Sequence, residues 1–385
     1  MLQQLLEQGY EEMVAIRRHL HMYPELSFQE VHTPAYIANY HRELGLAVRE
    51  GVGGRGVVAT LRGAKPGKTV AIRADFDALP IQELNDVPYK SKNDGVMHAC
   101  GHDGHTAIAL GLAKALVKMQ DELTGNIVFI HQFAEELTPG GAMAMIEDGC
   151  LEGVDVIFGT HLWAPMPFGE IQVREGAIMA AADAVTIHIQ GRGGHGAEPH
   201  QAVDAVLVGA QFVTNTQAVV ARKVDPLKPA VFSVGHFEAI NSFNVIADTV
   251  QLKGTVRTFD ADVRDVMERE IEAVLKSVCD ANGATYTYDY VRGYPPVVNH
   301  AAETAFVANI AQQYATVSTT PPMMIGEDFG YYMEHVPGTF FFTGAKHPAW
   351  EAVYPHHHAR FEFDERAMLI AAKTLGDATL QYLAQ

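Results

Sequence analysis

The stretch MHACGHDGHTAIALGL (residues 97–112) places one cysteine and three histidines within its first nine residues and then continues as an apolar helix. We expect Cys100 and His102 on a loop that leads into a helix near Thr106. A thiolate and an imidazole are good ligands for zinc and related transition metals. A C-x-H pair alone is weak evidence, because a buried cysteine beside a structural histidine is at least as common. The interpretation of this stretch therefore depends on the segments around it.

Those segments alternate between apolar strands and helical patterns. Strands are expected at TVAIRADF (69–76), NIVFIHQF (126–133) and VDVIFGTHL (154–162), with a first helix over 2–20 and a closing helix over 364–383. Nearly continuous apolar strands that alternate with helices are typical of parallel sheets covered on both faces. We therefore predict an α/β fold with a mixed, mostly parallel sheet flanked by helices.

The pattern changes near Ala182. The runs AVTIHIQG (184–191) and TVQLKGTVRTF (249–259) alternate polar and apolar residues, as half-exposed antiparallel strands do, and helices are expected over about 202–222 and 261–281. This indicates an inserted α+β domain within the α/β domain. The predicted boundaries are 1–181 and 294–385 for the two parts of the catalytic domain and 182–293 for the insertion.

Composition excludes some classes of partner and favours one compartment. The net charge is -18, from 28 basic and 46 acidic residues, so nucleic acid and anionic membranes are not expected as partners. Three cysteines, Cys100, Cys150 and Cys279, make a poor disulfide framework and fit a reducing compartment. No apolar run approaches the roughly 18 residues of a membrane span, and the N-terminus lacks the layout of a signal peptide. We expect a cytoplasmic enzyme.

Two glycine-rich stretches resemble a dinucleotide-binding loop. A strand follows GVGGRG (51–56), which therefore predicts a turn. GRGGHG (191–196) lies between a strand and a helix, and a nicotinamide-dependent oxidoreductase is the alternative that it raises. The fingerprint also needs an acidic residue about 20 residues further on, but the next strand ends near Glu238, about twice that distance away. The histidine in this loop instead suggests an imidazole that approaches a ligand.

Other candidate ligands follow predicted strands. Asp75 and Asp77 lie at the end of one strand, Glu135 and Glu136 come just after another, and His161 lies at the end of a third, while three histidines occupy 356–358. The carboxyl ends of parallel strands meet along one crevice, where ligands bind. Each residue has an ordinary alternative role, such as a core histidine or a helix-start charge. It is improbable that every one of these residues has only its ordinary role, so a metal site is favoured.

Glu135 and Glu136 are adjacent and must point in different directions. If one binds metal, the other is free to act as a general base toward water. The spacing does not say which glutamate takes which role.

Motifs along nearly the whole chain resemble one family. They are RRHLHMYPELSFQE, RADFDALPIQE, MHACGHDGHTA, the AEE of HQFAEEL, GTHLW, GRGGHGAEPH, FNVIADT, GTVRTFD, GEDF and HHARF. In these motifs and their order the chain is similar to metal-dependent N-acyl-L-amino acid amidohydrolases, the aminoacylase and hippurate hydrolase group of dinuclear zinc exopeptidase-like enzymes. The resemblance implies a catalytic α/β domain interrupted by a lid domain that also mediates dimerisation.

The resemblance also implies roles for single residues. The ligands of a two-metal site would be Cys100, His102, Glu136, His161 and His357. Glu135 would be the general base and His195 would contact the substrate carbonyl, with Asn244 and Arg257 binding the substrate. A strand-face salt bridge is an equally good interpretation of Arg257.

The chain departs from the related patterns at two positions. Asp75 stands where related exopeptidases have a histidine ligand, and Ala359 stands where a proline usually follows the histidine pair. Glu327 in GEDF matches a family position to which we assign no role.

We therefore predict hydrolysis of N-acyl-L-amino acids to a carboxylic acid and a free amino acid. Two divalent ions per subunit are expected, zinc first, with cobalt, manganese or nickel as alternatives, in a homodimer or a dimer of dimers. A non-catalytic, zinc-stabilised binding protein is a third hypothesis. It is disfavoured because a structural zinc site is normally closed by four ligands and has no spare base.

Overall fold

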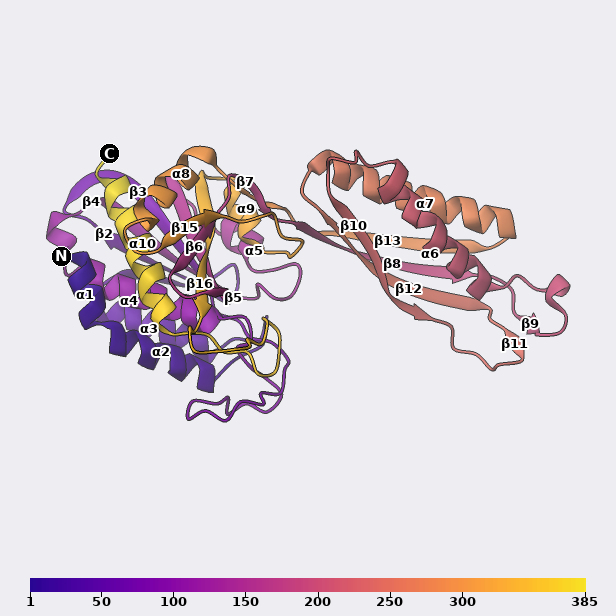
Figure 1. Ribbon diagram of the computed structural model, residues 1–385, viewed down its shortest axis with the longest axis horizontal. Helices are drawn as coiled ribbons and strands as arrows, with labels where there is room; N and C mark the ends of the chain where they lie inside the picture. Colours follow the sequence, from indigo (N-terminus) through magenta and orange to yellow (C-terminus); the bar gives the residue numbers. More distant parts are fainter. The chain divides into compact units, whose positions relative to one another are not determined.

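Eight strands of the first structural unit form one mixed sheet in the order β1-β2-β4-β3-β5-β16-β6-β15 (Figure 1). Their bounds are β1 Ala47–Val52, β2 Gly56–Arg62, β3 Lys65–Asp75, β4 Thr124–Gln132, β5 Val156–Pro167, β6 Glu170–Val173, β15 Thr316–Thr319 and β16 Gly338–Lys346. The central pairs β4–β3, β3–β5 and β5–β16 are parallel, and so is β6–β15, whereas β1–β2, β2–β4 and β16–β6 are antiparallel. The predicted fold class is confirmed.

The computed structural model describes residues 1–385, which divide into two units. The first comprises Met1–Ile178, Val297–Pro322 and Asp328–Gln385, and the second comprises Met179–Pro296 and Met323–Glu327. The expected insertion at 182–293 falls within the second unit. None of the helices is both long and apolar enough to cross a membrane.

Helices of the first unit pack against its sheet and against one another. They are α1 Leu2–Gln8, α2 Tyr10–Met22, α3 His32–Glu43, α4 His102–Val117, α5 Ala142–Glu147, α8 Ala301–Ala311, α9 Phe329–Met333 and α10 Arg366–Leu383, with a 3-10 turn η1 at Gln120–Glu122. Nearly all of α4 is buried, because it packs on α2, α10 and β3. The first helix, predicted as continuous over 2–20, is divided at Gly9, a weak helix former at which α1 ends and α2 begins. Strands β7 (Gly176–Met179) and β14 (Val297–Asn299) form a separate pair.

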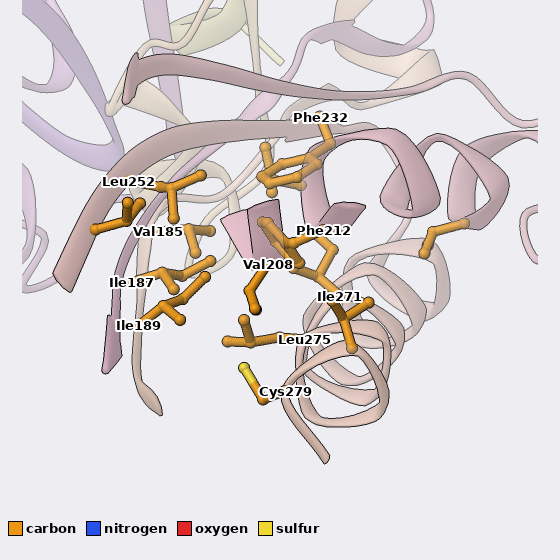
Figure 2. Packing of buried hydrophobic residues seen from close by; sticks show 14 of the residues in the cluster. Val185, Ile187, Ile189, Val208, Phe212, Phe232, Leu252, Ile271, Leu275 and Cys279 are labelled. Atoms are coloured by element: carbon orange, nitrogen blue, oxygen red, sulfur yellow. The ribbon is translucent and has the colours of Figure 1, made fainter. Parts of the chain in front are cut away.

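The second unit is a four-stranded antiparallel sheet with two helices on one face. The strands are β8 Ala181–Gln190, β10 Ala230–Glu238, β12 Thr249–Thr258 and β13 Thr285–Tyr294, in the order β10-β12-β8-β13. Alternate residues of β8 are buried, so one face of the strand packs on helices α6 (Ala205–Arg222) and α7 (Ala261–Asn282). Figure 2 shows Val185 and Ile187 of β8 facing Phe212 of α6 and Leu275 of α7. The predicted antiparallel pattern is confirmed.

The glycine-rich stretch GRGGHG does not form a dinucleotide loop. It includes β9 (Gly194–His195), which pairs with β11 (Val245–Ile246), and the 3-10 turn η2 (Pro199–Gln201) follows it. Helix α6 begins only at Ala205, where the side chain of Asp204 accepts hydrogen bonds from two backbone amides of the first turn. The loop therefore lacks the helix N-terminus that holds a pyrophosphate. GVGGRG forms the predicted turn, between β1 and β2.

Two histidines form a buried pair between α3 and β4. The Nε2 atoms of His41 and His131 lie 2.8 Å apart, both side chains are fully buried, and neither Nδ1 atom has a hydrogen-bond partner. Burial lowers the pKa of His41 to about 4, and burial together with the neighbouring His41 lowers the pKa of His131 well below its usual value. The pair is therefore neutral in the folded protein.

This pair predicts a loss of stability in acid. An unfolded histidine takes up a proton near pH 6.5 whereas the folded pair resists it, so the unfolded state binds more protons as pH falls below about 6.5. The shift of His41 alone corresponds to about 2 kcal/mol lost by about pH 5. We therefore expect the urea concentration at the unfolding midpoint, measured in EDTA, to decrease when the pH is lowered from about 7.5 to about 5. The decrease should be clearly smaller in the His41→Leu/His131→Leu double variant. Equal losses in the two proteins would contradict this prediction.

Candidate metal centre

The candidate ligands gather near the carboxyl ends of the central strands. Asp75 is the last residue of β3, and Glu135 follows the end of β4 by three residues. The last ladder pair between β3 and β5 is Ile72 with Phe158, three residues before Asp75 and His161 respectively. The sequence predicted His161 at the end of its strand, and this prediction is wrong. Strand β5 continues to Pro167 because β16 pairs with it beyond this point.

Gly101 sets the positions of the first two candidate ligands. Its φ of 102° lies in the left-handed region that favours glycine, and α4 begins immediately afterwards. His102 is therefore in the first turn of the helix, not on a loop before Thr106, and Cys100 directly precedes the turn. Both side chains are buried.

Five predicted ligands come together in overlapping groups. The potential ligand atoms of Cys100, His102 and His161 lie within 4.8 Å of one another, and so do those of Cys100, Glu136 and His357. Nε2 of His357 is 3.2 Å from one carboxylate oxygen of Glu136, and Nε2 of His102 is 3.8 Å from the other. Cys100 and Glu136 each belong to two of these overlapping groups, so they connect the candidate ligands into one cluster.

Hydrogen bonds aim the two buried imidazoles at the cluster. Nδ1 of His102 donates to the backbone oxygen of Asp77 at 3.0 Å, with the Asp77 carboxylate at 3.1 Å. Nδ1 of His161 donates to the backbone oxygen of Leu162 at 2.8 Å. In each ring Nε2 is then left facing the cluster, which is how supporting hydrogen bonds orient metal-binding histidines.

These residues fit a cation. Nε2 of His102 and Oε1 of Glu136 are buried and have no hydrogen-bond partner in the protein. Buried acceptors of this kind are normally satisfied, and a metal ion would satisfy both. Burial raises the pKa of the Cys100 thiol well above its usual value, and the carboxylates of Glu136 and Glu135 raise it further. The positive charge of a bound ion favours the thiolate that a metal ligand must be.

Only one of the three histidines at 356–358 is free to reach the cluster. His356 donates from Nδ1 to the Cys100 backbone oxygen at 3.1 Å and accepts at Nε2 from the Ala164 amide at 3.3 Å. His358 accepts from the Arg360 amide at 3.0 Å and stacks on a tyrosine. His357 remains, with a left-handed φ of 65° and its amide bound to the Ala99 oxygen at 2.8 Å. This arrangement favours His357 as the ligand.

Asp75 is engaged by other side chains. Its carboxylate accepts from Arg73 and from Nδ1 of His105, each at 2.6 Å. Although burial raises the pKa of Asp75, Arg73 and the histidines His102 and His105 hold it well below its usual value. Nε2 of His105 in turn accepts from the Leu162 amide at 3.0 Å. Sequence reasoning left His105 without a role, although its spacing from His102 places both on one face of α4.

The three remaining predicted residues, His195, Asn244 and Arg257, belong to the second unit. His195 and Asn244 lie on neighbouring segments, whereas Arg257 lies apart from them. Val245 pairs with His195 across β9 and β11, and the Gly196 amide donates to the Asn244 backbone oxygen at 2.9 Å. Nδ1 of the exposed His195 accepts from the Ala197 amide at 3.1 Å, which places the proton of the neutral ring on Nε2.

Arg257 lies toward the opposite end of β12 from these residues. Thr249, the first residue of β12, pairs with Gln190 of β8, close to the β9 segment, whereas Arg257 pairs with Ala182. The eight residue steps from Thr249 to Arg257 span about 26 Å at about 3.3 Å per residue. No carboxylate forms an ion pair with Arg257, whose Nη1 donates to the Val256 backbone oxygen at 3.0 Å. The salt-bridge interpretation of this residue therefore has no partner in the structure.

Comparison with known proteins gives consistent matches over most of the chain. Peptidase family M20/M25/M40 matches residues 71–381. YhaA of Bacillus subtilis (strain 168), which is named as an amidohydrolase, is 58% identical over 98% of this chain and 96% of its own length. An N-acyl-L-amino acid amidohydrolase of Geobacillus stearothermophilus is 48% identical over 78% of this chain and 81% of its own. The crystal structure of Bacillus subtilis YXEP, described as a dinuclear metal-binding peptidase of the M20 family, superposes with a TM-score of 0.85 at 33% identity and covers 98% of this chain and 99% of that one.

The three cysteines allow a direct test of the metal centre. Cys100 faces the candidate ligands, whereas Cys150 and Cys279 are buried elsewhere and belong to none of these groups. Cys100→Ala should lose bound metal and activity together, measured by elemental analysis after gel filtration and by turnover. Cys150→Ala and Cys279→Ala are the matched controls and should keep both. Full metal content in Cys100→Ala would show that the thiolate is not a ligand.

Proposed function

The chain belongs to peptidase family M20/M25/M40, and we propose that it hydrolyses the amide bond of N-acyl-L-amino acids to a carboxylic acid and a free amino acid. The observation that carries this proposal is the pair Glu135–Glu136 beside the candidate ligands. Glu136 is within 3.2 Å of His357 and shares a group with Cys100, whereas Glu135 lies 4.0 Å from His102 and in no group with Cys100. The names of the similar proteins support the substrate class.

We infer two divalent cations, held by Cys100, His102, Glu136, His161 and His357. Thiolate, imidazole and carboxylate ligands suit zinc best, and cobalt, manganese or nickel would also fit. When bound, such ions polarise the amide carbonyl and make water more acidic.

Glu135 acts as the general base in this proposal. The residue is 7% exposed, a desolvated setting that suits proton transfer. Glu135 takes one proton from the attacking water, whose oxygen bonds to the carbonyl carbon. As the carbon–nitrogen bond breaks, Glu135 delivers that proton to the departing nitrogen. The products are then a carboxylic acid and a free amino group, and Glu135 is again ionised.

Residues of the second unit bind the substrate in this proposal. The Nε2 proton of His195 would be donated to the developing oxyanion, an interaction that often contributes most to rate enhancement. Arg257 would bind the amino-acid carboxylate with its planar guanidinium, and Asn244 would add a polar contact. Burial lowers the pKa of Arg257, and the charge of Asp183 acts in the opposite direction.

The separation of these residues supports a homodimer. Thr249, at the end of β12 that leads to the β11 and β9 segments, lies about 26 Å along the strand from Arg257, further than one small N-acyl amino acid extends. We infer that His195 and Asn244 reach the site of a second copy, in a two-fold dimer or a dimer of such dimers. The acidic net charge of -18 supports neither nucleic acid nor an anionic membrane as a partner. Three unpaired cysteines are consistent with a cytoplasmic location.

The proposed function is tested by assaying amide cleavage and metal content on one sample. Purified protein loaded with zinc should release glycine from hippurate and amino acids from N-acetyl-L-amino acids, without any nicotinamide. Chelation should abolish release, and re-addition of metal should restore it. Metal-loaded protein that cleaves neither class of substrate would contradict the proposal.

The acidic pair should separate into two phenotypes in the same assay. Glu135→Gln keeps the side-chain shape but removes the base, so metal should stay bound while kcat falls by about 10²–10⁴-fold. Glu136→Gln should lower metal occupancy first. Exchange of the two phenotypes would reverse the assignment of base and ligand.

Mixed dimers test whether His195 acts across subunits. His195→Ala should lower turnover and leave bound metal unchanged, because the residue belongs to none of the candidate metal groups. Mixing inactive Glu135→Gln and His195→Ala subunits under exchange conditions should restore one intact site per mixed dimer. Native mass spectrometry can verify that mixed dimers form. Verified mixed dimers without activity would show that His195 does not act on the partner's site.

A further inference from the structure

The backbone amides on both sides of Glu135 are each held by a buried carboxylate. The Ala134 amide donates to Oε1 of Glu30 at 3.0 Å, and the Glu136 amide donates to Oδ2 of Asp77 at 3.0 Å. Ala134 itself has a left-handed φ of 52°, which a residue other than glycine adopts only where its surroundings impose it. The direction of the Glu135 side chain therefore depends on these two anchors.

Glu30 belongs to a segment that is distant in the sequence from Glu135. The segment supplies one of the two carboxylates and also contacts the other, Asp77. In PELSFQE (24–30), Ser27 Oγ donates to the Asp77 carboxylate at 2.7 Å. The ring of Phe28 packs edge-on against Phe133, with ring centroids 5.8 Å apart. Together with Glu30 these contacts fix the segment beside the loop that follows β4.

The surroundings of Glu30 are unusual for a carboxylate. The residue is 1% exposed, its Oε2 atom has no hydrogen-bond partner, and the nearest cationic atom is Nε of Arg55 at 3.9 Å. Burial raises the pKa of Glu30 to about 7, and the charge of Asp77 acts in the same direction. A buried acidic group with one strong hydrogen bond is costly in stability. The bond to Ala134 is therefore the contact that gives this position a function.

We propose that Glu30 is a positioning residue for Glu135: by holding the Ala134 amide, it fixes the backbone turn from which the base reaches the attacking water. This inference rests on the proposed function, in which Glu135 is the general base. Glu30 belongs to none of the candidate metal groups. Asp77 is a less suitable probe because it also holds His102, so a change there would disturb a ligand.

Two conservative variants separate the effect of the position of the Glu30 acceptor oxygen from the effect of its charge. Glu30→Gln keeps an oxygen that can accept from Ala134 and removes the charge, whereas Glu30→Asp keeps the charge and withdraws the acceptor by one methylene. On zinc-loaded protein with hippurate, Glu30→Asp should lower kcat by about 10–100-fold, since a displacement of about 1 Å can cost that much. Its KM should stay within about twofold and its metal content unchanged. Glu30→Gln should keep kcat within about threefold of wild type.

Glu25 provides the matched control. It lies in the same segment, and its carboxylate accepts from the backbone amides of Val31, His32 and Thr33 at the start of α3, away from Glu135. Glu25→Asp should lower the thermal midpoint without lowering kcat.

Three results would overturn the inference about Glu30. They are an unchanged kcat in Glu30→Asp, an equal loss of kcat in Glu30→Gln, or a loss of metal that parallels the loss of activity. A wild-type protein that cleaves no N-acyl amino acid would overturn the proposed function, and this inference with it.

Discussion

Nε2 of His102 faces a buried space in which it has no hydrogen-bond partner, and Oε1 of Glu136 is in the same situation. Each buried, unsatisfied polar atom costs about 1–3 kcal/mol. The surrounding hydrogen bonds maintain this arrangement, because Asp77 and the Leu162 carbonyl bind the opposite nitrogens of His102 and His161. A bound cation would satisfy these atoms, since it would accept electron pairs from the imidazole, the carboxylate and the thiolate at once. The turn at Gly101 and the hydrogen bonds of the two Nδ1 atoms hold these side chains in one place.

The fold could be predicted from patterns that extend along a whole helix or strand, because the burial of its faces determines where its apolar residues stand. Apolar strands and the alternation along β8 follow directly from which faces are covered, so the parallel centre and the antiparallel second sheet were both predictable. The candidate ligands could be found for a related reason, because carboxyl ends of parallel strands share an edge. The errors concern ends of elements. Gly9 divides a helix that periodicity alone presents as continuous, and β5 runs past His161 because a strand far along the chain pairs with it.

The supporting residues of the centre could not be predicted from local patterns. Glu30 meets Ala134 across 104 positions of the chain, and His356 meets the Cys100 loop across 256. Nothing in the residues near Glu30 indicates such partners. The sequence also does not show which of two adjacent glutamates would be the metal ligand and which the general base. Only the placement of Glu136 beside His357 distinguishes the two. Arg257 is similar, since its lack of an acidic partner becomes visible only once every neighbouring strand is in place.

The pairing of β5 with β16 also has a consequence for how the chain is made. Strand β5 ends at Pro167 and its neighbour begins at Gly338, so 170 residues lie between the two partners. At about 5–20 residues per second, the ribosome needs roughly 10–30 s to deliver β16 after β5 has emerged. During that interval the strands and helices within Met179–Pro296 emerge as one continuous piece, while an apolar edge of β5 stays unpaired. Unpaired apolar edges are templates for aggregation. The segment around VIFGTHLWA is therefore the part of the nascent chain that most needs shielding until residue 346 has left the ribosome.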